Sequence, residues 1–248
     1  MQSRNILGVR VDDVTLDEVV ALIEEWAHEK DSLSRLVVTA NPEYIMAARS
    51  NASFRELVNS AALVTPDGVG LLYAGKLLRQ PFRSRVTGVA LVHALAKCSA
   101  ESDLSLFLLG AAEGVAEAAA ESLRKQYPGV KIAGCFAGNA ASDGDFETLT
   151  KVRRAQPHIV LVAYGMVKQD YWAARNLSKS GAALSIGVGG VFDYISGRTR
   201  LAPLWVRRAG LEWLYRLGRE PKRWRRILEA VPFFGAVVLL EAARQRLR

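Results

Sequence analysis

Short apolar runs alternate with longer amphipathic segments up to about residue 190. Six runs rich in β-branched and apolar residues predict strands at 36–39, 62–65, 104–109, 131–133, 159–163 and 183–188. The segments between them have helical periodicity and predict helices at 16–30, 42–59, 88–99, 114–127, 145–155 and 169–178. Strands of this kind that alternate with helices are typical of a parallel sheet covered on both faces. The pattern therefore predicts a Rossmann-like α/β fold with a mostly parallel sheet.

The character of the chain changes after residue 197. Residues 198–248 carry 13 Lys/Arg and 4 Asp/Glu, a net charge of +9, whereas the remaining residues carry 20 and 21, a net charge of −1. This segment also holds three of the five tryptophans and an apolar run of ten residues at 231–240. We therefore predict an α/β core over 1–197, built as one lobe or two, and a basic amphipathic helical appendage over 198–248.

The appendage has three possible partners: the protein's own core, a membrane and a nucleic acid. Its apolar run is too short to span a bilayer, which takes about 20 residues. Basic clusters and tryptophans beside such a run favour an interfacial helix on an anionic membrane. The segment matches no nucleic-acid motif, so we expect no nucleic-acid partner. Exposed apolar surface would also favour a homo-oligomer.

The expected compartment is the cytoplasm, at the inner face of the plasma membrane. The first 11 residues lack the apolar core of a signal peptide. Cys98 and Cys135 lie far apart in apolar surroundings and match no metal or redox spacing, so we expect buried, reduced thiols.

Polar residues follow the predicted strands, and ligands of parallel α/β sheets bind at the carboxyl ends of strands. Thr39 and Asn41 follow the first strand, and Asp67 follows the second. A carboxylate in this place can take a proton from an attacking hydroxyl group. An Asp-Gly pair such as 67–68 is also typical of a plain turn. The spacing alone leaves both interpretations open.

Two basic residues next to predicted helices, Arg85 and Lys168, have a similar ambiguity. Either is explained as a solvated charge near a helix start, and either could bind phosphate or a sugar hydroxyl. Asp143 and Asp145 resemble a metal-binding Asp-x-Asp pair, but they precede a predicted helix and are better explained as its cap. The three histidines have no ligand spacing. We therefore expect no metal and no other cofactor.

Taken together, the motifs of this chain resemble the WecG/TagA/CpsF family of bacterial glycosyltransferases, from about residue 8 to residue 226. The ordered set is more specific than any single motif. It comprises Thr39-x-Asn41-x-Glu43, Asp67-Gly68, Arg85-x-x-Gly88, Lys168-Gln169, Gly187-x-Gly189-Gly190-x-x-Asp193, and Gly210-Leu-Glu-Trp-Leu-Tyr-Arg216 followed by Glu220-Pro-x-Arg223.

This resemblance implies an inverting, metal-independent glycosyltransferase that uses a UDP-sugar, typically UDP-N-acetylmannosamine or its uronate. The implied acceptor is polyprenyl-pyrophosphoryl-N-acetylglucosamine, and the product would feed a cell-surface polysaccharide. Two other functions are compatible with parts of the sequence. A nucleic-acid-binding protein would use the basic appendage, and a soluble nucleotide-sugar isomerase or epimerase would turn over the donor without any acceptor.

The resemblance also implies roles for particular residues. Asp67 looks like the general base, with Thr39 and Asn41 beside it. Gln169 and the loop with Gly187, Gly189 and Gly190 look like donor contacts, and Arg85, Lys168 and Asp193 are further expected substrate-binding residues. The arginines that close over the diphosphate would be Arg216, Arg223 and Arg226. Ala90, the 167–170 segment and the 201–203 segment differ from the family pattern, which leaves the donor open to a hexuronate or hexose.

Overall fold

The computed structural model describes residues 1–29, 34–203, 205–206, 209–219, 224 and 229–247. Its centre is a six-stranded sheet with the strand order β4-β3-β8-β7-β5-β6, and all neighbouring strands are parallel. The strands are β3 (Arg35–Ala40), β4 (Leu63–Pro66), β5 (Ser105–Gly110), β6 (Lys131–Phe136), β7 (Ile159–Ala163) and β8 (Leu184–Gly187). The prediction of a mostly parallel α/β sheet is confirmed.

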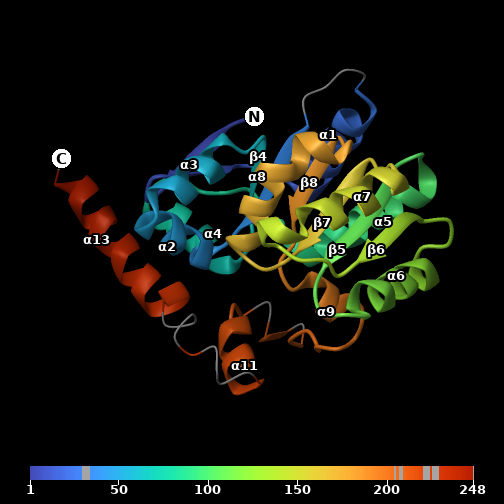
Figure 1. Cartoon of the computed structure of the whole chain (residues 1–248). Coiled ribbons are helices and arrows are strands. Elements are labelled where there is room, and N and C mark those ends of the chain that lie inside the picture. The colour runs from blue at the N-terminus through green and yellow to red at the C-terminus, as the bar shows by residue number, and fades with distance from the viewer. Residues whose placement is uncertain (30–33, 204, 207–208, 220–223, 225–228, 248) are drawn as a thin grey trace.

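Helices cover both faces of this sheet, and each face has its own apolar core (Figure 1). Successive residues of a strand point to opposite faces, so Val37 and Val38 of β3 belong to different cores. One core includes residues of α2 (Pro42–Ser50), α3 (Ala52–Ser60), α4 (Val69–Leu77), α7 (Asp145–Ala155) and α8 (Lys168–Ser180). The other includes residues of α1 (Leu16–His28), α5 (Gly88–Glu101), α6 (Val115–Gln126) and α9 (Val191–Ile195).

Three features of the core differ from the predicted elements. An antiparallel hairpin of β1 (Ser3–Ile6) and β2 (Val9–Asp12) precedes α1, and α4 follows β4 directly. Gly70 and Gly75 lie inside α4, and glycine weakens the helical signal of a sequence. The predicted helix at 42–59 is two helices, because Asn51 is extended and its side chain accepts a hydrogen bond from the Phe54 amide. Asn51 thus ends α2 and caps α3.

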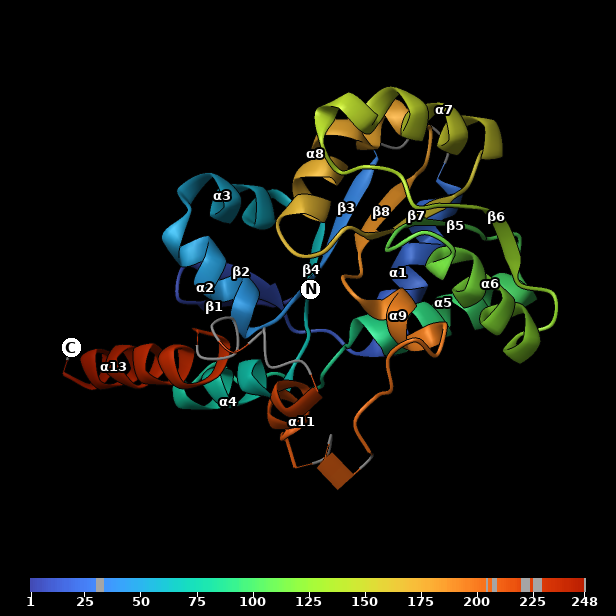
Figure 2. The same ribbon diagram turned by 60° about the horizontal axis from the view of Figure 1, so that its bottom comes forward.

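The described part of the appendage includes α11 (Glu212–Arg219) and α13 (Phe234–Arg246), and a π-helical turn, Glu229–Phe233, leads into α13. Figure 2 shows α13 lying along α4. Phe234, Val238 and Ala242 of α13 are buried in the same core as α2 and α4. The part of the apolar run within α13 therefore packs on the protein's own core by one face.

The other face of this run is open to solvent. Phe233, Leu239 and Leu240 are 55%, 58% and 63% exposed. Core packing and a membrane-facing surface are thus compatible in one helix, and the interfacial role of the appendage stays a prediction. Within the described ranges, no helix has the length and apolar character needed to cross a membrane.

Two adjacent phenylalanines, Phe233 just before α13 and Phe234 at its start, allow a matched test of how this helix packs. Phe234 is 4% exposed and Phe233 is 55% exposed. We expect Phe234→Ala to lower the free energy of unfolding by about 3 kcal/mol, because it removes a buried aromatic ring. Phe233→Ala should lower it by less than about 1 kcal/mol. Denaturant unfolding of both variants measures the difference, and equal losses would show that α13 does not pack as described.

Candidate active site

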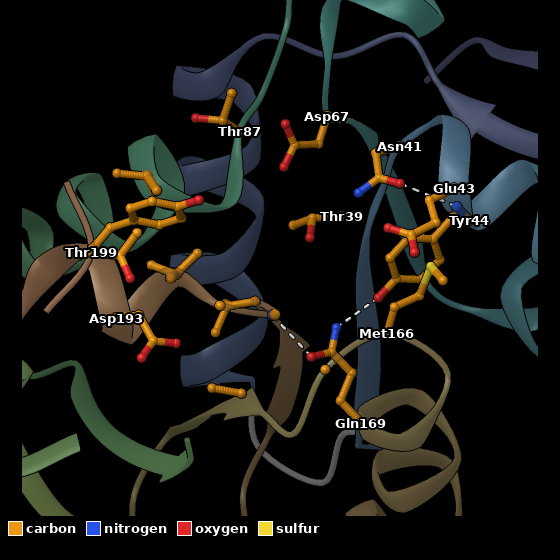
Figure 3. Close-up of a pocket in the computed structure, with 18 of the residues that line it drawn as sticks. Thr39, Asn41, Glu43, Tyr44, Asp67, Thr87, Met166, Gln169, Asp193 and Thr199 are labelled. Atoms are coloured by element: carbon orange, nitrogen blue, oxygen red, sulfur yellow. Dashed lines mark hydrogen bonds between the residues drawn. The ribbon is translucent and has the colours of Figure 1, made fainter. Parts of the chain in front are cut away.

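A cavity of about 370 Å³ lies at the carboxyl ends of β3, β4, β7 and β8 (Figure 3). We call it the active-site cavity. Its volume is within the range of small-molecule sites in proteins. The described residues that line it are Thr39, Asn41, Glu43, Tyr44, Asp67, Arg85, Thr87, Val89, Ala163, Tyr164, Gly165, Met166, Gln169, Val188, Gly189, Gly190, Val191, Asp193, Tyr194, Thr199, Leu201 and Glu212.

Asp67 stands between β4 and α4, and its backbone is held on the neighbouring strand. Its amide donates to the Ala40 carbonyl at 2.6 Å, and its Oδ2 accepts from the Gly88 amide at 3.2 Å. Gly68 has φ +101°, a conformation that favours glycine. The tight turn expected of an Asp-Gly pair is therefore present, and it directs the carboxylate into the cavity (Figure 3).

Thr39 and Asn41 reach the cavity from the end of β3. The Thr39 hydroxyl donates to the Gly187 carbonyl at 2.9 Å, which joins β3 to the end of β8. The Asn41 Oδ1 accepts from the Tyr44 amide at 3.1 Å and so caps α2. With its oxygen used by this cap, the Asn41 side chain directs its amide nitrogen toward the cavity (Figure 3).

Gln169 links three strand ends through one buried amide. Its Nε2 donates to the Tyr44 hydroxyl at 2.6 Å, and its Oε1 accepts from the Gly189 amide at 2.9 Å. The side chain is 1% exposed at the cavity wall. These bonds connect α8, which follows β7, with α2, which follows β3, and with the loop after β8. Gln169 thus fixes the shape of the cavity.

A buried carboxylate supports this amide. The Tyr44 hydroxyl donates to Asp170, with 3.1 Å to Oδ2, and Oδ2 also accepts from the Val167 amide at 3.0 Å. Burial raises the pKa of Asp170 to about 6. Burial and the nearby Asp170 carboxylate raise the pKa of Tyr44 well above its usual value. Tyr44 therefore keeps its proton at neutral pH and acts as a hydrogen-bond donor.

The loop after β8 forms the opposite wall. A Cβ atom on Gly187 would lie 2.6 Å from the Gln169 Nε2, so this position lacks room for a side chain. Gly189 has φ +58° and lines the cavity with Gly190. Asp193 also lines it, and its Oδ1 is 4.0 Å from the Arg198 Nε. Gly187 itself does not line the active-site cavity.

Arg85 lies at the rim of the cavity and contacts the appendage. Its Nη1 is 3.3 Å from the Glu212 Oε2 in α11. Both side chains are partly exposed, so this ion pair adds little stability. The ion pair shows that α11 lies at the edge of the cavity.

A second cavity, of about 290 Å³, adjoins the first and is rich in arginine. It shares Tyr194, Thr199, Leu201 and Glu212 with the active-site cavity. Its other described wall residues are Gly197, Arg198, Arg200, Ala202, Tyr215 and Arg219. We call it the basic cavity. Its guanidinium groups suit an anion that extends from the active-site cavity.

The structure does not bring all of the expected residues together. Lys168 is exposed at the start of α8 and does not line the active-site cavity. Arg216 belongs to α11, but its side chain lies outside the described part of the structure. Arg223 and Arg226 lie entirely outside the described residues.

Other residues at the site were not expected from the sequence. Tyr44 and Asp170 form its buried support, and Glu212 stands at its edge. The motifs contained a signal for two of them, because Asp170 follows Gln169 and Glu212 lies inside the motif at 210–216. Arg198, Arg200 and Arg219 belong to the basic segment whose charge was recognised, but its placement beside the cavity depends on the fold.

Asp143 and Asp145 do not cap α7 as predicted. Helix α7 has no side-chain cap, and Asp145 instead accepts from the Arg175 Nε at 2.6 Å and from the Asn176 Nδ2 at 2.8 Å. The hydrogen bond from Arg175 lowers the pKa of Asp145. Asp143 accepts from the Asn139 side chain at 3.0 Å. Among the described residues, no three His, Cys, Asp or Glu side chains gather as metal ligands would.

The two cysteines are free, and both are half-buried where buried thiols were expected. Burial raises the pKa of Cys135 to about 11, so its thiol stays protonated at neutral pH. Neither residue lines the active-site cavity.

Comparison with known proteins gives a consistent result. Residues 4–248 match the sequence model described as "Glycosyl transferase WecG/TagA/CpsF family". The chain is 31% identical over 243 residues to the N-acetylglucosaminyldiphosphoundecaprenol N-acetyl-beta-D-mannosaminyltransferase of Bacillus spizizenii, covering 98% of this chain and 93% of the relative. It is 30% identical over 233 residues to proteins of the same name from Staphylococcus aureus strains MW2 and NCTC 8325, covering 93% of this chain and 89% of each relative. The family expected from the motifs is thereby confirmed: the chain is an enzyme of the WecG/TagA/CpsF family of glycosyltransferases.

Proposed function

We propose that this enzyme transfers N-acetylmannosamine from a UDP-linked donor to N-acetylglucosamine carried on a polyprenyl diphosphate. The relatives are named for transfer of N-acetyl-beta-D-mannosamine to N-acetylglucosaminyldiphosphoundecaprenol. The observation that carries the proposal is the Asp67 carboxylate, which is held by the Gly88 amide and directed into a polar cavity at the strand ends. A fixed carboxylate suits the deprotonation of a sugar hydroxyl.

The proposed reaction is a single displacement with inversion. The acceptor hydroxyl oxygen forms a bond to the anomeric carbon of the donor as the bond from that carbon to the UDP oxygen breaks. Asp67 takes the hydroxyl proton, and the electron pair of the broken bond leaves with UDP. Thr39 and Asn41 lie beside Asp67 at the end of β3 and would orient the acceptor sugar.

Stabilisation of the leaving diphosphate is proposed to come from arginines. Arg85 lines the active-site cavity, and Arg198, Arg200 and Arg219 line the adjoining basic cavity. Guanidinium groups pair with diphosphate oxygens through two hydrogen bonds at once and can neutralise the developing charge without a metal ion. Arg216, Arg223 and Arg226 are proposed to add to this group.

The proposed working place is the inner membrane surface. The acceptor named for the relatives carries an undecaprenol chain, and the appendage combines a net charge of +9 with the exposed apolar face of α13. Basic charge and exposed apolar side chains together favour an anionic interface.

The proposed base is tested by Asp67→Asn. This change should lower the rate of transfer from UDP-N-acetylmannosamine by about 10²–10⁴-fold, because an amide cannot accept the proton. The donor should still raise the melting temperature of the variant, as a bound ligand does. The matched control is Asp143→Asn, an exposed aspartate that does not line the cavity and should keep full activity. Near wild-type transfer by Asp67→Asn would remove this residue from the mechanism.

Independence from metal ions is tested with a chelator. We expect the transfer rate to be unchanged after incubation with excess EDTA and gel filtration, because arginines are proposed to carry the leaving-group charge. Assays with and without added Mg²⁺ or Mn²⁺ make the measurement. A loss of activity that either ion restores would contradict the proposal.

Membrane binding is tested on the exposed face of α13. The double change Leu239→Ser and Leu240→Ser should weaken binding to phosphatidylglycerol vesicles by about tenfold, because both apolar side chains are lost from the interface. Thermal stability should change little, since the two residues are 58% and 63% exposed. Phe146→Ser removes an 84% exposed phenylalanine from α7 and serves as the control. If the wild-type protein, the double variant and Phe146→Ser sediment equally with vesicles, the membrane-binding surface does not include Leu239 and Leu240.

A further inference from the structure

A third cavity begins at Asp67 and leads away from the active-site cavity. Its volume is about 310 Å³, and it shares Asn41, Glu43, Asp67 and Glu212 with the active-site cavity. Helix α4 forms one side and α13 forms the other, and these two helices lie along each other in Figure 2. We call it the apolar groove. The two spaces meet at the carboxylate that is proposed to act as the base.

The groove differs from the active-site cavity in its chemistry. Beyond the four shared residues, its described wall has no charged side chain. It consists of Pro42, Gly68, Val69, Gly70, Tyr73, Ala74, Leu77, Gly210, Trp213, Ala230, Val231, Phe234, Gly235 and Val238. Tyr73 and Leu77 are 59% and 41% exposed although both are large. Exposed apolar side chains along a groove indicate a ligand that covers them.

The glycines of the groove show where it is open. A Cβ atom on Gly70 would lie 2.7 Å from the Pro42 Cγ, so the wall is closed at that point. A Cβ atom on Gly235 would meet no atom within 4 Å. The groove therefore has free space on the α13 side.

The chemistry of the proposed acceptor identifies the occupant. Its reacting sugar must lie at Asp67, and its hydrocarbon begins on the far side of the diphosphate. Among the described cavities that border Asp67, the apolar groove is the one whose wall suits a hydrocarbon. The exposed Leu239 and Leu240 lie on the same helix, α13, that forms one side of the groove. A polyprenyl hydrocarbon that passed from a bilayer along α13 into the groove would stay on apolar surface.

We infer that the apolar groove between α4 and α13 binds the isoprene units nearest the diphosphate of the lipid-linked acceptor. This inference rests on the proposed function, since it takes the acceptor to be a polyprenyl diphosphate. It assigns the two helices a direct part in acceptor selection: the active-site cavity binds the sugars, and the groove binds the first part of the hydrocarbon.

The inference is tested by filling the groove with Gly235→Trp. Its matched control is Gly218→Trp, because Gly218 is also helical and in open space but does not line the groove. Each protein is assayed with N-acetylglucosaminyl diphosphate esterified either to undecaprenol or to ethanol, in one detergent. The measured quantity is the ratio of kcat/KM for the long-chain acceptor to kcat/KM for the short-chain acceptor.

We expect Gly235→Trp to lower this ratio at least about tenfold, because the indole displaces buried hydrocarbon from the wall. Gly218→Trp should leave the ratio unchanged. An unchanged ratio in Gly235→Trp, or an equal loss with both acceptors, would overturn the inference. If the wild-type enzyme transfers sugar to neither acceptor, the proposed function fails instead.

A binding measurement tests hydrocarbon binding in the groove independently of catalysis. Farnesyl diphosphate, which contains no sugar, should raise the melting temperature of the wild-type protein and of Gly218→Trp, and should raise that of Gly235→Trp much less. Equal shifts in all three proteins would place the hydrocarbon outside the groove. Sedimentation velocity supplies the last check, because a dimer that only Gly235→Trp disrupts would identify a second copy of the chain as the occupant and overturn the inference.

Discussion

One buried amide holds the active site together. Gln169 joins the ends of β3, β7 and β8 through its bonds to Tyr44 and to the Gly189 backbone. A parallel sheet brings strand ends to one edge, but it does not hold the loops beyond them in a particular arrangement. Here the arrangement is set by an amide whose oxygen and nitrogen both have protein partners, supported from behind by the buried Asp170. The wall of the cavity is therefore built before any ligand arrives, which favours catalysis by preorganised groups.

The two spaces that adjoin the active-site cavity differ in polarity. Arginines line the basic cavity on one side, and apolar side chains line the groove on the other. The two substrates of the proposed reaction differ in the same way, because one is a nucleotide and the other ends in a hydrocarbon. Glu212 of α11 borders all three spaces. A single helix of the appendage thus stands where the two substrates would meet.

The sequence predicted the parts of the fold that depend on local pattern. Five strands of the sheet were found because buried parallel strands are continuous apolar runs, whereas β6, a partly exposed edge strand, was predicted only over its first half. Asp67 could be picked out because it directly follows such a strand. Helix α4 was missed because its two glycines hide its periodicity. The role of Tyr44 could not be predicted, since its partner Asp170 is 126 residues away and the two meet only through the strand order.

The tight fit between Gly187 and Gln169 has an evolutionary consequence. A methyl group at position 187 would lie 2.6 Å from the Gln169 Nε2, so a larger residue there would require Gln169 to move away from its partners Tyr44 and Gly189. Shortening Gln169 first would remove the bonds to Tyr44 and Gly189. A single change at either position would therefore disturb this contact or these hydrogen bonds, although a paired change could restore the packing. Residues 169 and 187 are therefore expected to change together rather than one at a time.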